Sequence, residues 1–205
     1  QEALAKRLVS ASFGIDGMKF RTGELTADEI QKITTGSSRF DIPMTLHFKP
    51  GITLDGLLSI MRNEHKQNGC RFFVFDYLQK LKLVRHKNAF NTSEALGEAT
   101  GALKEFAGEY DSVVILLSQL TREVEESDYK IPNELRFFKG SGDIEADGDM
   151  LFGMWRPGYY NILKDNKGND ISDILRLYPL KFRDGHLPDI DLYWNSSTYS
   201  YSSSR

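Results

Sequence analysis

The pattern of hydrophobic and polar positions along the chain contains three continuous apolar runs. They lie in the segments RFFVFDY (residues 71–77), SVVILLSQL (112–120) and GDMLFGMW (148–155). The first run does not alternate between apolar and polar positions, so it predicts a strand that is buried on both faces. The other two runs predict further apolar strands of the kind found in parallel sheets covered by helices.

Helical spacing of apolar residues fills much of the chain around these runs. It opens the sequence in QEALAKRLVSAS. A capping box formed by Thr26 and Glu29 predicts another helix from about residue 27 to 34. A further helix is predicted between an N-cap at Thr53 and a stop at Gly69, because Thr favours helix starts and Gly favours helix ends. Residues 91–111 predict a long helix with apolar positions 3.6 residues apart.

The remaining segments complete the predicted fold. Residues 44–48 (MTLHF) predict a short strand, and residues 174–185 and 188–194 predict a hairpin. Strands that alternate with helices predict an α/β fold, with a largely parallel central β-sheet flanked by helices and a C-terminal β-hairpin. The folded domain is expected over residues 1–195, and the Ser/Tyr-rich tail, 196–205, is expected to be disordered.

Composition and charge narrow the class of protein. The 205 residues are 40% hydrophobic and 27% charged, which suits one soluble domain, or two at most. Because the formal net charge is −3, any contact with nucleic acid must come from local basic patches. The single cysteine, Cys70, makes no internal disulfide and favours a reducing, cytoplasmic location. Neither a membrane-spanning apolar stretch nor a signal peptide is expected.

Polar residues follow the first two apolar runs, where ligands collect in open α/β sheets. Asp76 ends the first run, and Ser118 and Gln119 end the second. Four apolar residues followed by Asp are typical of the strand that holds magnesium in P-loop nucleotidases. The alternative is a structural Asp76 that accepts hydrogen bonds from a neighbouring loop. Gln119 likewise admits two interpretations, a group that orients water or senses phosphate, or a buried amide satisfied by backbone.

A family resemblance rests on four blocks that occur in order at suitable spacings. The blocks are FFVFDYLQKL, VVILLSQLTREVE, ELRFFKGSGDIEADGDMLFGMWRP and LKFRDG. Together they resemble the RecA-like motor domain of the replicative hexameric DNA helicases of the DnaB family. The earlier stretch LVSASFGIDGMKFRTGELTADEIQKI is similar to the segment that this family has between its P-loop helix and its Walker B strand. The resemblance covers residues 3 to about 194.

The resemblance implies roles for the matched residues of the nucleotide site. Asp76 resembles the Walker B aspartate that helps to hold the Mg²⁺ of MgATP. Gln119 matches the glutamine that links the nucleotide site to the DNA side, and Ser118 lies in the same motif. Lys181 and Arg183 resemble the element that reaches the γ-phosphate of the adjacent subunit, with Arg183 as the arginine finger. The expected catalytic residues are thus Asp76, Gln119, Lys181 and Arg183, and the expected nucleotide contacts are Asp76, Ser118, Lys181 and Arg183.

The resemblance also implies a contact with single-stranded DNA. The third block is similar to the loop that lines the central channel of the helicase ring. This similarity assigns DNA binding to five residues: Arg136, Lys139, Gly140, Ser141 and Gly142. Cations and backbone donors suit this task, because binding to single strands requires no readout of bases.

Two features near these residues admit two interpretations each. Phe137 and Phe138 stand in a loop a few residues longer than the family usually has, and they can either stack on bases or belong to the core. The basic run at residues 80–87 can either line a DNA channel or form a solvated loop.

The function implied is that of part of an ATP-dependent replicative DNA helicase, a hydrolase that unwinds duplex DNA by translocating on single-stranded DNA. The family forms hexameric homo-oligomeric rings, and a primase and a helicase loader are expected partners. Alternatives are a RecA-like module that only assembles the ring, without catalysis, or another ATPase of the RecA family.

The sequence departs from the family in one respect, because no G-x-x-x-x-G-K-[ST] motif occurs in it. In the family this P-loop precedes the matched segment, so we expect an N-terminal segment to be missing here. The fragment alone is then expected to retain neither ATP nor Mg²⁺ and to be inactive as an ATPase. Without them, the carboxylate of Asp76 is expected to be satisfied by water or by nearby donors such as Ser118 or Gln119.

Overall fold

The computed structural model describes residues 2–40, 43–82, 92–138 and 141–204. The chain divides into two compact units. The first comprises Gln1–Phe48, Arg156–Arg176 and Asp191–Arg205, and the second comprises Lys49–Trp155 and Leu177–Ile190. Among the described residues, the helices are too short or too polar to cross a membrane.

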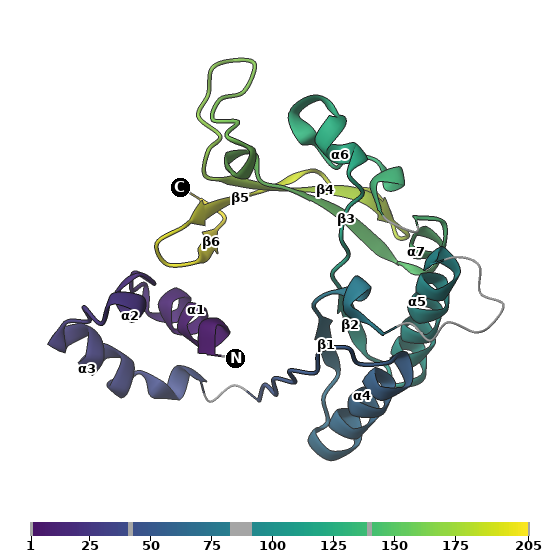
Figure 1. Ribbon diagram of the computed structural model, residues 1–205, viewed down its shortest axis with the longest axis horizontal. Helices are drawn as coiled ribbons and strands as arrows, with labels where there is room; N and C mark the ends of the chain where they lie inside the picture. The colour runs from purple at the N-terminus through teal and green to yellow at the C-terminus, as the bar shows by residue number, and fades with distance from the viewer. Residues whose placement is uncertain (1, 41–42, 83–91, 139–140, 205) are drawn as a thin grey trace. The chain divides into compact units, whose positions relative to one another are not determined.

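The helices and strands are labelled in Figure 1. The helices are α1 (Glu2–Phe13), α2 (Lys19–Thr22), α3 (Ala27–Thr35), α4 (Leu54–Asn68), α5 (Thr92–Glu109), α6 (Glu123–Glu126) and α7 (Ser141–Asp147). The strands are β1 (Phe72–Phe75), β2 (Val113–Leu116), β3 (Met150–Trp155), β4 (Ile174–Phe182), β5 (Ile190–Asn195) and β6 (Ser200–Ser202). Short 3-10 turns lie between them, including η4 (Leu135–Phe137).

The helix ends follow the local signals in the sequence. Thr53 caps α4 by accepting a hydrogen bond from the backbone N–H of Gly56, and Gly69 ends the helix in the left-handed conformation with φ of 65°. A capping box joins Thr26 and Glu29 at the start of α3. The predicted bounds of α4 are thereby confirmed.

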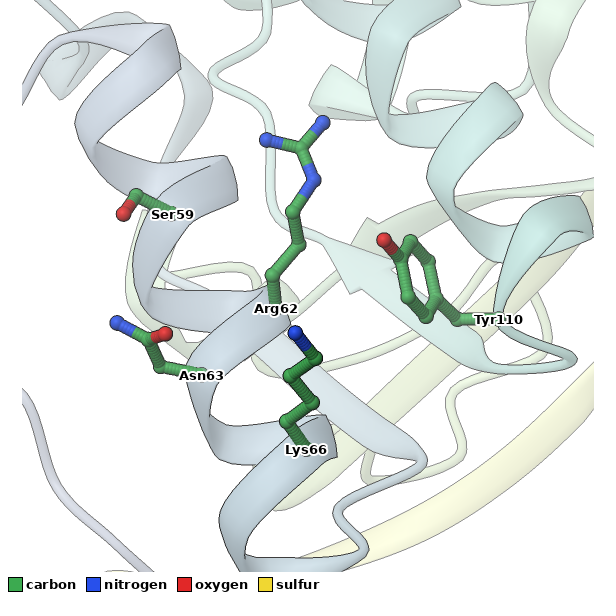
Figure 2. Close-up of a pocket in the computed structure, with 5 residues that line it drawn as sticks. All are labelled: Ser59, Arg62, Asn63, Lys66 and Tyr110. Atoms are coloured by element: carbon green, nitrogen blue, oxygen red, sulfur yellow. The ribbon is translucent and has the colours of Figure 1, made fainter.

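The outer side of α4 carries a shallow pocket of about 210 Å³. Figure 2 shows Arg62 and Lys66 extending from α4 beside the ring of Tyr110, which follows α5. Ser59 and Asn63 complete the lining. None of the site residues that the sequence predicts lines this pocket.

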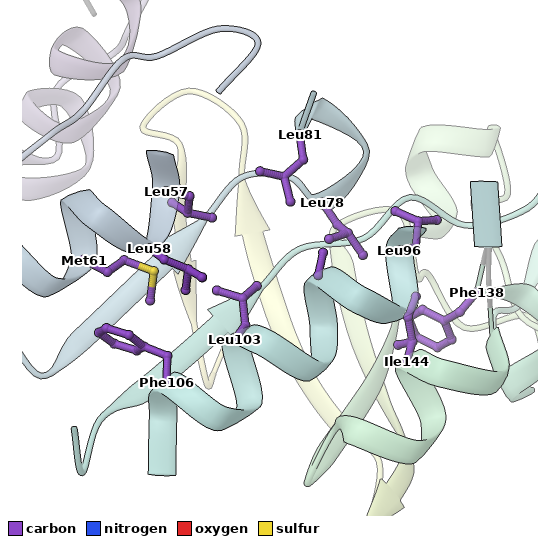
Figure 3. Close-up of a cluster of buried hydrophobic side chains, with 11 residues drawn as sticks. Leu57, Leu58, Met61, Leu78, Leu81, Leu96, Leu103, Phe106, Phe138 and Ile144 are labelled. Atoms are coloured by element: carbon purple, nitrogen blue, oxygen red, sulfur yellow. The ribbon is translucent and has the colours of Figure 1, made fainter. Parts of the chain in front are cut away.

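The core of the second unit lies between the β1–β2 sheet and helices α4 and α5. The two strands pair in parallel, from Phe72 opposite Val113 to Phe75 opposite Leu116. Figure 3 shows the buried cluster, whose members on the two helices are Leu57, Leu58, Met61, Leu96, Ala99, Leu103 and Phe106. The inward side chains of the strands pack against it, and the rings of Phe73 and Phe106 meet edge to face with centroids 5.4 Å apart.

The prediction that the first strand is buried on both faces is wrong. Phe72 and Val74 are 58% and 60% exposed, and Val113 and Ile115 on the partner strand point the same way. Helices α4 and α5 cover only the other face of this sheet. An unbroken apolar run shows that both faces of a strand are apolar, but it does not show whether other elements pack against both faces.

The strand predicted at residues 44–48 is also absent from the structure. Residues 43–48 have no strand assignment, and Met44, Leu46 and Phe48 are exposed. An apolar residue at every second position fits a pleated strand, but a strand forms only where a second backbone offers a hydrogen-bonded partner. Alternation alone carries no information about that partner.

Four strands form a second sheet in the order β3-β4-β5-β6, and the predicted C-terminal hairpin supplies β4 and β5. The tail differs from its prediction, because Ser200–Ser202 pairs antiparallel with Tyr193–Asn195. The ring of Tyr201 also lies against Trp194, with centroids 4.6 Å apart. Backbone pairing and this aromatic contact order a segment whose Ser-rich composition predicted disorder.

Candidate functional site

All the predicted site residues belong to the second unit, and two groups of them form around different elements. The first group stands at the carboxyl ends of β1 and β2, which meet because the strands are parallel. Asp76 directly follows β1, and its peptide bond to Tyr77 is cis. Its side chain is exposed and makes no hydrogen bond or ion pair within the described parts of the chain. The interpretation of Asp76 as a satisfied structural residue therefore finds no support.

The amide of Gln79 organises the end of the neighbouring strand. Its Nε2 donates a hydrogen bond to Oγ of Ser118 at 3.0 Å, and its Oε1 accepts one from the backbone N–H of Gln119 at 3.0 Å. The N–H of Leu78, which is fully buried, donates to the carbonyl of Leu117 at 2.9 Å. Ser118 and Gln119 are thus bound to Gln79, and the alternative in which they satisfy Asp76 is wrong.

Gln79 is the residue that sequence reasoning missed at this site. It lies within the DYLQ block, three positions after Asp76, and this polar position directly after the buried Leu78 was the available signal. Its two partners lie 39 and 40 residues away along the chain. Only the parallel pairing of β1 with β2 brings them within reach.

The segment after Gln119 is joined to the predicted DNA-contact segment through the backbone. Leu120 forms an isolated antiparallel bridge with Phe138. The N–H of Thr121 donates to the carbonyl of Phe137 at 2.7 Å. A direct backbone connection therefore runs from the end of β2 to the turn η4.

Phe137 and Phe138 are core residues. They are 2% and 8% exposed, and Phe138 belongs to the main buried cluster. The interpretation in which their rings stack on bases is therefore wrong for this conformation, because buried rings present no face to a ligand. The apolar side chains instead anchor the turn from which the next residues project.

The described residues among those predicted to contact DNA lie at the surface on either side of this anchor. Arg136 is exposed, and its Nε pairs with Oε2 of Glu134 at 2.7 Å. Gly142 is exposed in the first turn of α7. Lys139 and Gly140 lie outside the described residues, and of Ser141 only the backbone, at the start of α7, is described. Most of the basic run at 80–87 also lies outside them.

The second group forms where β4 ends beside the last turn of α7. Lys181 donates hydrogen bonds to the carbonyls of Glu145 and Ala146. Nη2 of Arg183 donates to the same Ala146 carbonyl at 2.9 Å, and its Nη1 lies 3.4 Å from Oδ1 of Asp149. These two cations thus occupy the negative end of a short helix, where carbonyls lack partners within the helix.

Asp149 is shared between two cations. Its Oδ2 accepts a hydrogen bond from Lys104 of α5, and its Oδ1 faces Arg183. The hydrogen bond from Lys104 is the largest cause that lowers the pKa of Asp149 from its ordinary value, and the charges of Lys104, Arg183 and Lys181 act in the same direction. Partial burial opposes this lowering of the pKa.

The two groups are separate in this structure. Within the described residues, no hydrogen bond or ion pair joins Asp76, Ser118 or Gln119 to Lys181 or Arg183. Nor do three or more His, Cys, Asp or Glu side chains converge there on a possible metal position.

Comparison with known proteins places this geometry in a family. The family model described as "DnaB-like helicase C terminal domain" matches residues 1–203. A "Probable replicative DNA helicase" of Trieres chinensis is 31% identical over 199 residues, which cover 96% of this chain and 43% of the relative. A "Replicative DNA helicase DnaB" of Geobacillus stearothermophilus is 30% identical over 175 residues, covering 85% of this chain and 38% of the relative. The chain thus spans less than half the length of these curated relatives.

Solved structures agree with the sequence relatives. One is described as "The Structure Of A DnaB-Like Replicative Helicase And Its Interactions With Primase", and another is described as an ATPase domain. Each is 25% identical with a TM-score of 0.82, and the match covers 96% of this chain and 46% and 68% of the two solved chains. The RecA-like α/β fold predicted from the sequence is confirmed. The chain belongs to the family of DnaB-like helicase C-terminal domains.

Proposed function

We propose that this chain is part of the motor of an ATP-dependent replicative DNA helicase, which unwinds duplex DNA by translocating on single-stranded DNA in the cytoplasm. The observation that carries the proposal is the connection from the loop that follows Asp76 to the segment predicted to contact DNA. It runs through Gln79 to Ser118 and Gln119, and then through the backbone bridge to Phe137 and Phe138. A motor needs such a connection between the site of hydrolysis and the track.

Asp76 is the proposed Mg²⁺ contact. Mg²⁺ in nucleotide sites is commonly bound by one or two carboxylates, several waters and the phosphates of the substrate. An exposed carboxylate at a strand end, with no competing cation bound to it among the described residues, fits this donor set. When MgATP is bound, the ion neutralises charge that develops on the phosphates during transfer.

Gln119 is the proposed link between nucleotide and DNA. Its backbone is fixed by the amide of Gln79, while the next two residues pair with Phe137 and Phe138. A displacement of this segment at the nucleotide would move η4 with it. Arg136 at η4 would then shift along the phosphate backbone, which it binds through its charge without reading the bases.

Lys181 and Arg183 are proposed to act on the nucleotide of an adjacent subunit. They are separate from the Asp76 group within one chain, which agrees with a site completed by two chains. A finger supplied by a neighbour couples hydrolysis to the geometry of the assembly. We therefore propose a homo-oligomeric ring of six subunits, with a primase and a helicase loader as partners.

The function is tested by ATP hydrolysis with and without single-stranded DNA, in the protein whose chain includes these residues. Asp76→Asn should reduce hydrolysis by about 100-fold or more, because it removes the charge that holds the ion. Asp189→Asn is the matched control, since Asp189 is an exposed carboxylate on a loop with no role in the proposed site. If the unmodified protein assembles but does not hydrolyse ATP, it is a non-catalytic ring module and the proposal fails.

A further inference from the structure

We propose that Asp149 is a positioning residue for Arg183. We further propose that helix α7 couples the orientation of Arg183 to the segment that is predicted to contact DNA. The proposal rests on the proposed function, because it assigns a holder to the residue that would reach the neighbouring nucleotide. The resemblance to the family assigns no role to Asp149, to Lys104 or to the last turn of α7.

Arg183 is fixed and exposed at the same time. One nitrogen of its guanidinium donates to the carbonyl of Ala146 at 2.9 Å, and another faces Asp149 at 3.4 Å. The backbone N–H of Arg183 also donates to the carbonyl of Asp149, at 3.2 Å. The side chain is nevertheless 49% exposed. A guanidinium has five N–H donors in a rigid plane, so these contacts orient the group and leave other donors for a phosphate.

Asp149 is itself held from the other side by Lys104. The lysine extends from α5 and bonds Oδ2, whereas Arg183 faces Oδ1. Because α5 packs in the main core through Leu103 and Phe106, Lys104 stands on a rigid support. The carboxylate therefore connects that support to the guanidinium.

Helix α7 is seated on α5 along its length. Near its C-terminal end, Oγ1 of Thr100 donates to Oδ2 of Asp147 at 2.5 Å. Near its N-terminal end, the side chain of Asp143 lies against Gly97, where a Cβ would collide with it. Between these points Ile144 is buried in the main cluster.

The two ends of α7 thus serve different parts of the site. Ser141 and Gly142, which are predicted to contact DNA, open the helix, and the carbonyls of Glu145 and Ala146 near its end hold Lys181 and Arg183. Seven helical residues span about 10 Å, so the ends are one short rigid element apart. A change at the DNA segment that tilts α7 would displace the carbonyls that orient Arg183.

The test is steady-state ATP hydrolysis by the full-length protein carrying Asp149→Asn, which removes the charge at nearly constant shape. We expect kcat to fall roughly tenfold, because a misplaced catalytic group costs rate without costing binding. KM for ATP and the affinity for single-stranded DNA should change less than about twofold. Arg183→Ala should cause a much larger loss, of roughly 1,000-fold or more.

Two further measurements separate positioning from general support of the fold. If Asp149 acts through Arg183, then adding Asp149→Asn to Arg183→Ala lowers kcat no further, whereas independent effects would multiply. Lys104→Met removes the support of Asp149 on α5. We expect it to lower the melting temperature and to reduce kcat by less than Asp149→Asn does, because the carboxylate remains to face Arg183. Glu105 is an exposed neighbour of Lys104 on α5, and Glu105→Gln should change neither the melting temperature nor kcat.

The outcomes distinguish this inference from the function on which it rests. If Arg183→Ala leaves hydrolysis unchanged, the finger itself is wrong. If Arg183→Ala abolishes hydrolysis but Asp149→Asn retains full kcat, the finger stands and the positioning role is overturned.

Discussion

At the scale of single residues, one side-chain amide sets the arrangement of the candidate nucleotide site. Gln79 uses both its donor and its acceptor on the loop that follows β2. Each such hydrogen bond contributes about 0.5–1.5 kcal/mol net. This is enough to select one loop conformation among several of similar free energy, so Gln79 determines where Gln119 stands.

Replacing Gln79 with Leu should release this loop. In this variant the backbone N–H of Gln119 loses its acceptor. We therefore expect its amide hydrogen to exchange with solvent about tenfold faster, which corresponds to a decrease of roughly 1.4 kcal/mol in the free energy of local opening. Site-resolved hydrogen exchange measures this rate. Gln67→Leu on the exposed side of α4 is the control, and an unchanged rate at Gln119 in Gln79→Leu would contradict the role of the amide.

The carboxylate of Asp149 should make folding stability depend on pH in a defined direction. Its pKa in the folded chain is lowered from 3.8, chiefly by the hydrogen bond from Lys104. A carboxylate with a lowered folded pKa contributes stability above its unfolded pKa, and this contribution is lost as pH falls through the folded pKa. Asp149 is partly exposed, so the contribution is at most about 1 kcal/mol.

Urea unfolding of the unmodified protein and of Asp149→Asn measures this contribution. The variant should be less stable at pH 7, and the difference in unfolding free energy should shrink as pH falls below 3.8 and vanish below the folded pKa. A difference that stays constant from pH 7 to pH 3 would mean that the ionised carboxylate is not what stabilises the fold.

Local patterns in the sequence located the charged strand end, but long-range contacts decided its surroundings. Asp76 could be predicted because an apolar run ends in it. The hydrogen-bond partners of Gln79 and Arg183 could not be predicted. Those of Gln79 lie 39 and 40 residues away in the chain, and the carbonyl that binds Arg183 lies 37 residues away. Sequence spacing gives no distance between such residues until the strands that bring them together are known.

At the scale of elements, prediction succeeded where the determining contacts are local. Helix α4 begins and ends at Thr53 and Gly69 because capping bonds involve neighbours within a few residues. The strand predicted at 44–48 failed because strand formation needs a partner that its own sequence does not specify. The buried position of Phe138 was left open for the same reason, since it depends on packing against α5 and α7.

Close packing of β3 predicts one sharply destabilising substitution. A Cβ at Gly153 would overlap the carbonyl oxygen of Pro132, and backbone cannot move aside as a flexible side chain can. Gly153→Ala should therefore destabilise the protein by about 1–3 kcal/mol. In Gly108→Ala on α5, a Cβ meets open space, and helix propensity should stabilise by up to about 1 kcal/mol. Chemical denaturation of both variants checks the contrast, and equal stabilities would contradict it.

At the scale of the whole molecule, the chain carries the proposed Mg²⁺ aspartate, the proposed linking glutamine and the proposed finger pair, but no G-x-x-x-x-G-K-[ST] motif. Phosphates need backbone donors and a lysine at such a loop. We therefore expect purified residues 1–205 to hydrolyse no ATP above background, with or without single-stranded DNA. Robust DNA-stimulated turnover by these residues alone would mean that another part of the chain binds the phosphates.

The central claim is that neighbouring subunits complete each other's nucleotide sites in a ring that separates DNA strands. It is tested most directly by ATP-driven unwinding of a forked duplex, with increasing fractions of Arg183→Ala subunits mixed into the unmodified full-length protein. A finger supplied in trans predicts that the rate falls more steeply than the fraction of unmodified subunits, because each variant subunit disables its neighbour. A strictly proportional fall, or no unwinding by the unmodified protein, would contradict the account.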